Sequence, residues 1–230
     1  MQTDLSENRR IIAIGDIHGC LFSLKKLIEK LNIEPGEQIV FLGDLIDRGH
    51  RSREVVEYVM GLGAQYSCHC IMGNHELMYL NYLDNRDVNN WVLCGGLATL
   101  KSYNSTDGRN IAQEHLAFFR NARFYIETEH YLFTHGGLDP ELSIQDNLRY
   151  YKPEEFCWQQ VHMRQSFRDS NNYNWKKTVV CAHTAVTEPV LLDKLIAVDT
   201  GCVYRENPKM GKLTAVILPE RTIVQIENCD

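Results

Sequence analysis

Short apolar segments alternate with segments of helical periodicity in the first third of the chain, and this order limits the possible folds. The apolar segments, which are typical of short buried strands, are Ile11–Ile14, Ile39–Leu42 and Tyr66–Met72. Leucines recur at helical spacing over residues 21–31, a second helix is expected from Ser52 to Gly61, and a third continues to Leu83. This strand–helix alternation predicts parallel strands joined by right-handed connections.

After Tyr125 the pattern changes to a series of strands. The expected strands cover residues 125–128, 131–134, 178–182, 190–199, 212–218 and 222–227, with hairpin connections at 127–130 and 192–194. They predict a second, partly antiparallel sheet, and residues 85–125 are expected to form a helical cap region. We therefore predict an α/β fold class, a two-sheet β-sandwich flanked by helices, in a single domain that covers residues 1–230.

The composition excludes some partners. The formal net charge of −6 argues against general nucleic-acid binding, which needs a basic surface. The first ten residues lack the apolar core of a signal peptide, and no apolar run approaches the length of a membrane span, so a cytoplasmic protein without membrane contact is expected.

The eight cysteines are then expected to be reduced thiols. Cys68 and Cys70 are expected to share one face of a buried strand rather than to bind zinc.

Five loops that follow predicted strands carry carboxylate, amide or imidazole side chains beside small residues. Their sequences are G-D-I-H-G at 15–19, G-D-L-I-D-R-G at 43–49, G-N-H-E at 73–76, T-H-G-G at 134–137 and C-A-H-T at 181–184. Each loop alone is as typical of a turn or a helix cap as of a ligand site. In α/β sheets, however, ligands gather beyond the carboxyl ends of the strands. The five loops are therefore expected to bring together the side chains of Asp16, His18, Asp44, Asn74, His135 and His183.

These six side chains predict a site for two metal ions. Three imidazoles and three oxygen ligands form a mixed set, which suits borderline divalent ions; Mn²⁺ is expected, with Fe, Zn, Co or Ni as alternatives. A set of oxygen ligands alone would indicate Mg²⁺ or Ca²⁺. Six ligands are too many for one ion with an open position, but they fit two ions roughly 3.5–4 Å apart, bridged by a carboxylate and a water. Two such ions attract a phosphate without a basic protein surface.

The ordered motifs resemble the phosphoprotein phosphatase family of metallophosphoesterases, in particular its short bacterial and phage members. The resemblance covers residues 11–218 and includes D-T-G-C at 199–202 and G-K-L-T-A-V at 211–216. It implies the calcineurin-like metallophosphoesterase fold and a division of the ligands between the metals. The first metal is expected on Asp16, His18 and Asp44, and the second on Asp44, Asn74, His135 and His183.

The resemblance also implies roles for three residues outside the ligand set. His75 is expected to donate a proton to the leaving group, and Asp47 to orient His75. Arg48 is expected to bind the substrate phosphate, for which a planar guanidinium is well suited.

Two departures from the family pattern concern substrate binding. A second phosphate-binding arginine is expected two residues after Trp158, but Gln160 stands there, so Arg164 or Arg168 is expected to take its place. Ala185 occupies the position at which related nucleases carry a further metal-binding histidine, which favours the phosphatase branch.

The sequence therefore predicts an enzyme, a metal-dependent phosphatase that hydrolyses phosphate monoesters by direct attack of a hydroxide that bridges the metals. The first expected substrate is phosphoserine or phosphothreonine in a phosphoprotein. The alternative is a small phosphorylated substrate, with a hydrolase of the diadenosine tetraphosphatase type acting on dinucleoside polyphosphates. A catalytically inactive scaffold is a third hypothesis, and it would be marked by the loss of a ligand or of the proton donor. All of these residues are present.

Overall fold

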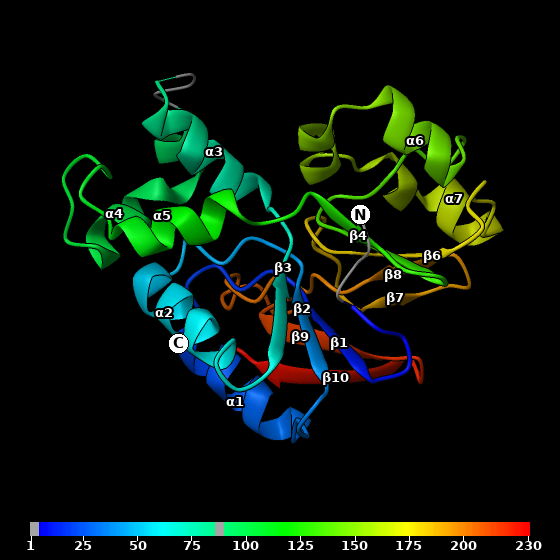
Figure 1. The fold of residues 1–230 in the computed structure, drawn as a ribbon, viewed down its shortest axis with the longest axis horizontal. Helices are drawn as coiled ribbons and strands as arrows, with labels where there is room; N and C mark the ends of the chain where they lie inside the picture. The colour runs from blue at the N-terminus through cyan, green and yellow to red at the C-terminus, as the bar shows by residue number, and fades with distance from the viewer. Residues whose placement is uncertain (1–4, 86–89) are drawn as a thin grey trace.

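Two five-stranded β-sheets form the centre of the computed structural model, which describes residues 5–85 and 90–230 (Figure 1). One apolar cluster lies between the sheets, and two further clusters join the outer faces of the sheets to helices. The order of layers is therefore helix, sheet, sheet, helix. This is the predicted two-sheet α/β sandwich.

The first sheet has the strand order β10-β9-β1-β2-β3. Its strands are β1 (Ile11–Ile14), β2 (Gln38–Phe41), β3 (Ser67–Cys70), β9 (Lys212–Leu218) and β10 (Thr222–Glu227). As predicted, β1, β2 and β3 are parallel. The expectation that 212–218 and 222–227 join the second sheet is wrong, because β9 pairs antiparallel with β1 and with β10. Alternate residues of β9 enter the two apolar clusters on either side of the first sheet.

The second sheet has the strand order β4-β5-β6-β8-β7. Its strands are β4 (Tyr125–Glu127), β5 (Tyr131–Thr134), β6 (Thr178–Cys181), β7 (Val190–Leu191) and β8 (Leu195–Ala197). The three central strands are parallel, and β4 and β7 are antiparallel at the two edges. The sheet is thus mixed, as predicted, and the expected strand at 190–199 is a short hairpin.

The period of two along β1 explains how one strand serves two cores. Ile11 and Ala13 belong to the cluster between the sheets, together with Phe133 of β5. Ile12 and Ile14 belong to the cluster under the helices. All of these side chains are buried. Each large apolar side chain contributes about 1.5–3 kcal/mol by leaving water, so the strand is fixed firmly at the base of the first loop.

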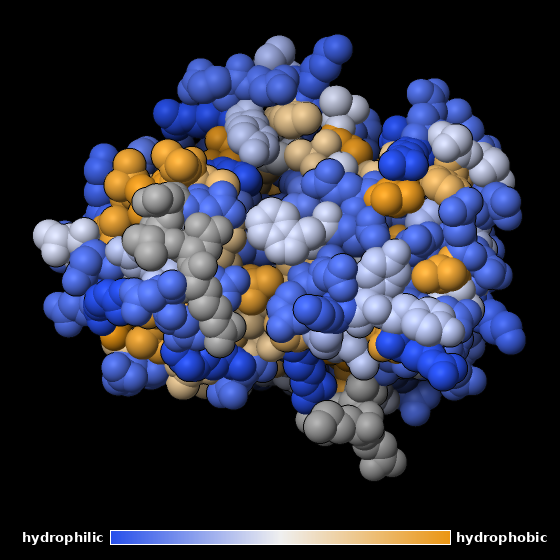
Figure 2. Space-filling view, turned by 90° about the horizontal axis from the view of Figure 1, so that it is seen from above, coloured by the Kyte–Doolittle hydropathy of each residue, from blue (hydrophilic) through white to orange (hydrophobic). Residues whose placement is uncertain are grey.

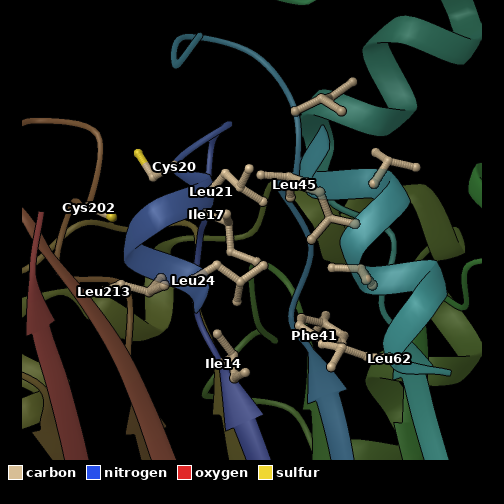
Figure 3. Packing of buried hydrophobic residues seen from close by; sticks show 14 of the residues in the cluster. Ile14, Ile17, Cys20, Leu21, Leu24, Phe41, Leu45, Leu62, Cys202 and Leu213 are labelled. Carbon is tan, nitrogen blue, oxygen red and sulfur yellow. The ribbon is translucent and has the colours of Figure 1, made fainter. Parts of the chain in front are cut away.

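Helices α1 (Leu21–Leu31) and α2 (Ser52–Leu62) cover the outer face of the first sheet. Figure 3 shows Phe41 of β2 beside Leu62 of α2, and Ile17 beside Leu24 of α1. These apolar contacts hold each helix against the sheet. The loops between strand and helix are therefore free to carry polar side chains.

The remaining helices form two groups on opposite sides of the molecule (Figure 1). One group contains α3 (Asn74–Leu83), a π-helical turn (Val92–Gly96), α4 (Leu97–Ser102) and α5 (Gln113–Arg120). The other contains α6 (Ile144–Tyr150), the 3₁₀ turns Pro153–Cys157 and Val161–Met163, and α7 (Gln165–Ser170). Seen from above, apolar side chains gather mainly over the first group (Figure 2).

The predicted cap at 85–125 corresponds to helices of the first group, while its residues 86–89 lie outside the described residues. Within the described ranges, no helix is long and apolar enough to cross a membrane.

Strand β3 is only partly buried, and the expectation of a buried strand here is wrong because β3 lies at the edge of the sheet. Cys68 and Cys70 nevertheless pack against the helix-side apolar cluster. All eight cysteines are free thiols. Burial raises the pKa of the Cys68 thiol to about 11, so it stays protonated at neutral pH.

The loops after the strands are tied to one another by backbone hydrogen bonds. The amides of Ile17 and His18 donate to the carbonyl of Asp44 at 3.1 and 2.8 Å, which joins the loops after β1 and β2. The amide of Ala182 donates to the carbonyl of His135 at 2.8 Å, which joins the loops after β5 and β6. The fold therefore holds the polar loops together at one edge of the sandwich.

Candidate metal centre and active site

A cavity of about 220 Å³ lies where the five loops meet. The predicted site residues that line it are Asp16, His18, Asp44, Arg48, Asn74, His75 and His183. Two further predicted residues, Asp47 and His135, are fully buried next to this lining. The structure thus brings together every predicted site residue except Arg164.

Asp44 lies at the centre of this group. Its Oδ2 atom is 3.5 Å from Nε2 of His18 and 3.4 Å from Nε2 of His135. In the described residues, Asp44 belongs to both groups that could hold a metal ion, one with His18 and His75 and one with His135 and His183. A single carboxylate shared by two ligand groups is the arrangement that a bridged pair of metal ions needs.

Hydrogen bonds to the protein backbone fix the orientation of two histidines. Nδ1 of His18 donates to the carbonyl of Ile46 at 2.8 Å, and Nδ1 of His135 donates to the carbonyl of Leu42 at 2.6 Å. In both rings Nε2 then faces Asp44. Metal-binding histidines are oriented in this way, with the second nitrogen bound to a carbonyl or carboxylate.

Asn74 connects the remaining ligands. Its Oδ1 atom is 2.9 Å from Nε2 of His135 and 3.0 Å from Nδ1 of His183. An amide oxygen and two imidazole nitrogens therefore point at one small region next to Asp44. The amide of His183 also donates to Oδ1 of Asp16 at 3.2 Å, which connects this group with the first loop.

Asp16 lies at the edge of the first group. Its Oδ2 atom is 4.0 Å from Nε2 of His18. His75 also lies near Asp44, with Nε2 of His75 at 3.9 Å from Oδ2 of Asp44. Both Asp16 and His75 therefore lie close to the pair formed by His18 and Asp44. They differ in the hydrogen bonds that they form with other residues.

Negative charge is concentrated in this site. Burial, with the charges of Asp199 and Asp44, raises the pKa of Asp16 well above its usual range. Burial alone would raise the pKa of Asp44 too, but His135 and His75 hold it well below its usual range. Burial would lower the pKa of His135, yet the carboxylates of Asp44 and Asp16 raise it to about 10. A protonated His135 thus partly balances the carboxylates, and divalent cations would balance them further.

The other two ligand imidazoles are neutral. Burial lowers the pKa of His18 well below its usual range. Burial and the neighbouring His135 lower the pKa of His183 to about 3. Neutral imidazoles carry the free nitrogen lone pair that binds a metal. Ligand types, orientation and charge in this site all fit two divalent metal ions.

His75 and Asp47 form a buried hydrogen-bonded pair, with Nδ1 of His75 2.7 Å from Oδ2 of Asp47. Trp91 Nε1 donates to both carboxylate oxygens of Asp47, at 3.1 and 2.9 Å, and Thr99 Oγ1 donates to Oδ1 at 2.6 Å. Asp47 is therefore held by two side chains of the predicted cap region. Nε2 of His75 is left to face the cavity, where it can transfer a proton.

The predictions from sequence include no role for Glu76, although it is the last residue of G-N-H-E. Its buried carboxylate accepts hydrogen bonds from the amides of Asp44 (2.9 Å), Leu45 (2.8 Å) and Ile46 (3.2 Å). Burial, together with the charge of Asp44, raises the pKa of Glu76 to about 7. Glu76 thus fixes the backbone of the loop that carries Asp44.

Several site residues have a left-handed backbone. The φ angles are 46° for His18, 52° for Asp44, 73° for Asp47, 66° for Arg48 and 64° for His183. Such angles cost roughly 1–2 kcal/mol each for residues with a side chain, and they persist where the surroundings enforce them. Their accumulation in the predicted loops supports a functional role for these loops.

Two glycines allow the loops to approach one another. A Cβ on Gly73 would lie 2.3 Å from both the amide and Oδ1 of Asp44. Gly43 has a φ angle of 99°, and a Cβ there would lie 2.8 Å from Nδ1 of His135. Both positions therefore need glycine for Asp44 and His135 to meet.

Arg48 lies at the rim of the cavity, with its guanidinium against Nε2 of His18 and 5.7 Å from the ring centre of Tyr204. Arg164 is exposed between the turn Val161–Met163 and α7, and neither Arg164 nor the alternative Arg168 is among the lining residues. Gln160 lines the cavity instead, and its Nε2 is 2.9 Å from Nε2 of His183. The predicted second phosphate clamp is therefore not found at Arg164.

Comparisons with known proteins identify the family of this chain. The family described as calcineurin-like phosphoesterase matches residues 9–210. The asymmetrical bis(5′-nucleosyl)-tetraphosphatase of Oceanobacillus iheyensis is 27% identical over 236 residues, which cover 94% of this chain and 92% of that protein.

Solved structures show the same fold. A protein described as a candidate diadenosine tetraphosphatase superposes with a TM-score of 0.71 at 22% identity, over 95% of this chain and 93% of the other. A protein serine/threonine phosphatase from Saccharomyces cerevisiae superposes with a TM-score of 0.66 at 20% identity, over 98% and 82%. Both classes of enzyme named in the sequence hypotheses therefore share this fold.

Proposed function

Because this chain belongs to the calcineurin-like phosphoesterase family, we propose that it uses two divalent metal ions to hydrolyse dinucleoside polyphosphates. The observation that carries the proposal is the position of Asp44, whose carboxylate is shared by two groups of ligands. The coarser conclusion, that the chain is a metallophosphoesterase, follows from the family alone.

The residues divide between two metal sites. We propose Asp16, His18 and Asp44 for one ion, and Asp44, Asn74, His135 and His183 for the other. The mixed nitrogen and oxygen ligands fit Mn²⁺, which we propose, and they would also fit Fe, Zn, Co or Ni. When bound, the two ions would neutralise charge on the phosphate and lower the pKa of the attacking water.

The protein groups around the ligands have separate tasks in hydrolysis. Water oxygen forms a bond to phosphorus, and the bond from phosphorus to the leaving oxygen breaks. Arg48 binds the phosphate oxygens from the rim of the cavity, where its guanidinium has room to move because the side chain is exposed. His75 delivers a proton from Nε2 to the leaving oxygen, while Asp47 keeps the Nδ1 proton in place.

The choice of substrate rests on the relatives. The sequence hypotheses put phosphoproteins first and dinucleoside polyphosphates second, and the names of the similar proteins favour the second. These relatives match over nearly their whole length, so the comparison concerns the entire enzyme. The structure adds that Gln160, a neutral side chain, stands in the cavity where the family pattern has an arginine. We therefore propose a bis(5′-nucleosyl)-tetraphosphate as the substrate.

The test is a substrate panel with Mn²⁺-loaded protein. Diadenosine tetraphosphate, a phosphothreonine peptide and glycerol 2-phosphate are compared by kcat/KM. We expect the dinucleotide to exceed the peptide at least about tenfold. A preference for the peptide would overturn the proposed substrate and restore the phosphoprotein hypothesis. Absence of turnover with all three, with metal bound, would support the scaffold hypothesis instead.

A further inference from the structure

A second cavity opens beside the metal centre. We call it the side cavity; it has a volume of about 620 Å³, and Ala185, Val203, Tyr204, Glu206, Asn207 and Met210 line it. Ala185 and Tyr204 also line the cavity of the metal centre, so the two cavities adjoin at these side chains. The volume lies in the range of roughly 300–1,000 Å³ that is typical of small-molecule sites.

The loop that forms the side cavity is held in place by its own hydrogen bonds. The carbonyl of Gly201 accepts from the amides of Tyr204 at 2.9 Å and Gly211 at 3.0 Å, and the carbonyl of Tyr204 accepts from the amide of Asn207 at 2.9 Å. The carboxylate of Asp199 accepts from the amide of Gly201 at 2.8 Å, which ties the loop to the metal centre. The cavity is therefore formed before any ligand binds.

Close packing against Gly201 fixes the ring of Tyr204, the largest side chain that lines the side cavity. Gly201 has a φ angle of 65°, and a Cβ there would lie 2.9 Å from Cδ2 of Tyr204 and 3.1 Å from Sδ of Met210. The tyrosine ring is 41% exposed and faces both cavities. A fixed, half-exposed aromatic ring next to a flexible thioether offers a surface on which a flat ring can stack.

The wall of the side cavity differs in chemistry from that of the metal centre. Ala185, Val203 and Met210 are apolar, whereas the metal centre is lined by charged and polar groups. A molecule with an anionic part and a less polar, ring-shaped part would match the chemistry of both spaces. At the rim, Asn207 and Glu206 offer hydrogen-bonding groups of the kind that read the edge of a base.

From this juxtaposition we propose that the side cavity binds the nucleoside of the substrate, with its base against Tyr204 and Met210 and its phosphate in the metal centre. The inference rests on the proposed function, which requires a nucleoside phosphate. Arg48 connects the two parts, since its guanidinium lies 5.7 Å from the centre of the tyrosine ring and at the rim of the metal centre. The occupant is inferred from adjacency, because the side cavity and the metal centre share the side chains of Ala185 and Tyr204.

The first test compares substrates with and without a nucleoside. Met210→Glu places a charge in the side cavity, and Leu191→Glu, on an exposed position outside both cavities, is the control of equal charge. We expect Met210→Glu to raise KM for diadenosine tetraphosphate at least about tenfold, as when a base no longer stacks. The kcat/KM for glycerol 2-phosphate should stay within about twofold of the wild type. Equal effects on both substrates, or none on either, would overturn the inference.

The second test does not depend on turnover. The affinities of metal-loaded protein for adenosine 5′-monophosphate and for inorganic phosphate are measured by calorimetry. The wild type and Leu191→Glu should prefer the nucleotide, and Met210→Glu should lose this preference; Met210→Ala, a milder change, should reduce it in part. A preference that survives in both Met210 variants would overturn the inference. Failure of the proposed function would look different, because the wild type would then not hydrolyse the dinucleotide at all.

Discussion

Nδ1 of His75 lies 2.7 Å from Oδ2 of Asp47, and both side chains are buried. This contact separates His75 from the ligand histidines, whose corresponding nitrogens are bound to backbone carbonyls at His18 and His135. Asp47 holds the imidazole of His75 so that Nε2 faces the cavity, and Trp91 fixes the carboxylate of Asp47 by hydrogen bonds. The arrangement suits a proton donor, but a carboxylate behind an imidazole also occurs in metal sites. Experiment can distinguish these roles.

His75→Ala is expected to slow turnover and leave the metal content unchanged. A proton donor matters most when the leaving group is a poor one, so kcat for glycerol 2-phosphate should fall about 100-fold or more. The loss should be smaller for diadenosine tetraphosphate, because a departing phosphate needs less help than an alkoxide. Kinetics and elemental analysis of the same samples measure both effects. If the variant loses one metal ion per chain, His75 is a ligand and the assignment is wrong.

Metal binding is expected to release protons at neutral pH. The carboxylates of Asp44 and Asp16 raise the pKa of His135 to about 10, so the metal-free protein carries this imidazole protonated. The pKa is raised on folding, so the stability contributed by His135 is present below about pH 6.5 and lost as the pH rises towards 10. A metal ion must displace this proton, so the apparent affinity should rise with pH from 7 to 9.

Calorimetry at pH 7 in buffers with different ionisation enthalpies measures the release. We expect at least about one proton for each pair of metal ions. His183 should add nothing, since its pKa is lowered to about 3 and the ring is already neutral. Binding without any proton release would contradict the assignment of His135 as a ligand.

Glu76→Gln is expected to destabilise the protein and weaken metal binding together. The substitution replaces one carboxylate oxygen by an NH₂ group, which cannot accept a hydrogen bond, so the contact with the backbone amide of either Asp44 or Leu45 is lost. Loss of hydrogen bonds to a charged, buried acceptor should lower the free energy of unfolding by about 2 kcal/mol. Urea denaturation of the metal-free protein measures the change.

The matched control is Glu57→Gln. Glu57 is an exposed residue of α2 that pairs with Arg53 at 2.8 Å, and loss of such a surface pair should cost at most about 0.5 kcal/mol. Equal stability of the two variants would show that Glu76 does not hold the Asp44 loop.

The convergence of the candidate ligand residues could be predicted because each of them lies in a short local motif. Asp16, Asp44 and Asn74 directly follow a glycine at the end of a short apolar segment, and parallel strands bring such ends to one edge. The helical spacing of the leucines in α1 likewise predicts a helix that covers the sheet. Where residue pattern and topology coincide, the sequence is sufficient.

Contacts between distant segments could not be predicted. Trp91 and Thr99 reach Asp47 from the cap region. Gln160 reaches His183 from the segment between the 3₁₀ turns Pro153–Cys157 and Val161–Met163. No local sequence pattern indicates that these segments contact one another. For the same reason the pairing of β9 with β1 was missed, since an apolar strand can join either sheet.

The side cavity could not be predicted from the sequence for a similar reason. Ala185 and Tyr204 belong to loops that follow different strands, and only the fold places them on one wall.

The central claim is that Asp44 bridges two metal ions, and its most direct test is the number of ions bound per chain. Metal-free protein is dialysed against Mn²⁺ and the bound metal is measured for the wild type, Asp16→Asn and Asp44→Asn. We predict about two ions for the wild type, about one for Asp16→Asn and close to none for Asp44→Asn. Two ions retained by Asp44→Asn, or a single ion in the wild type, would contradict the account.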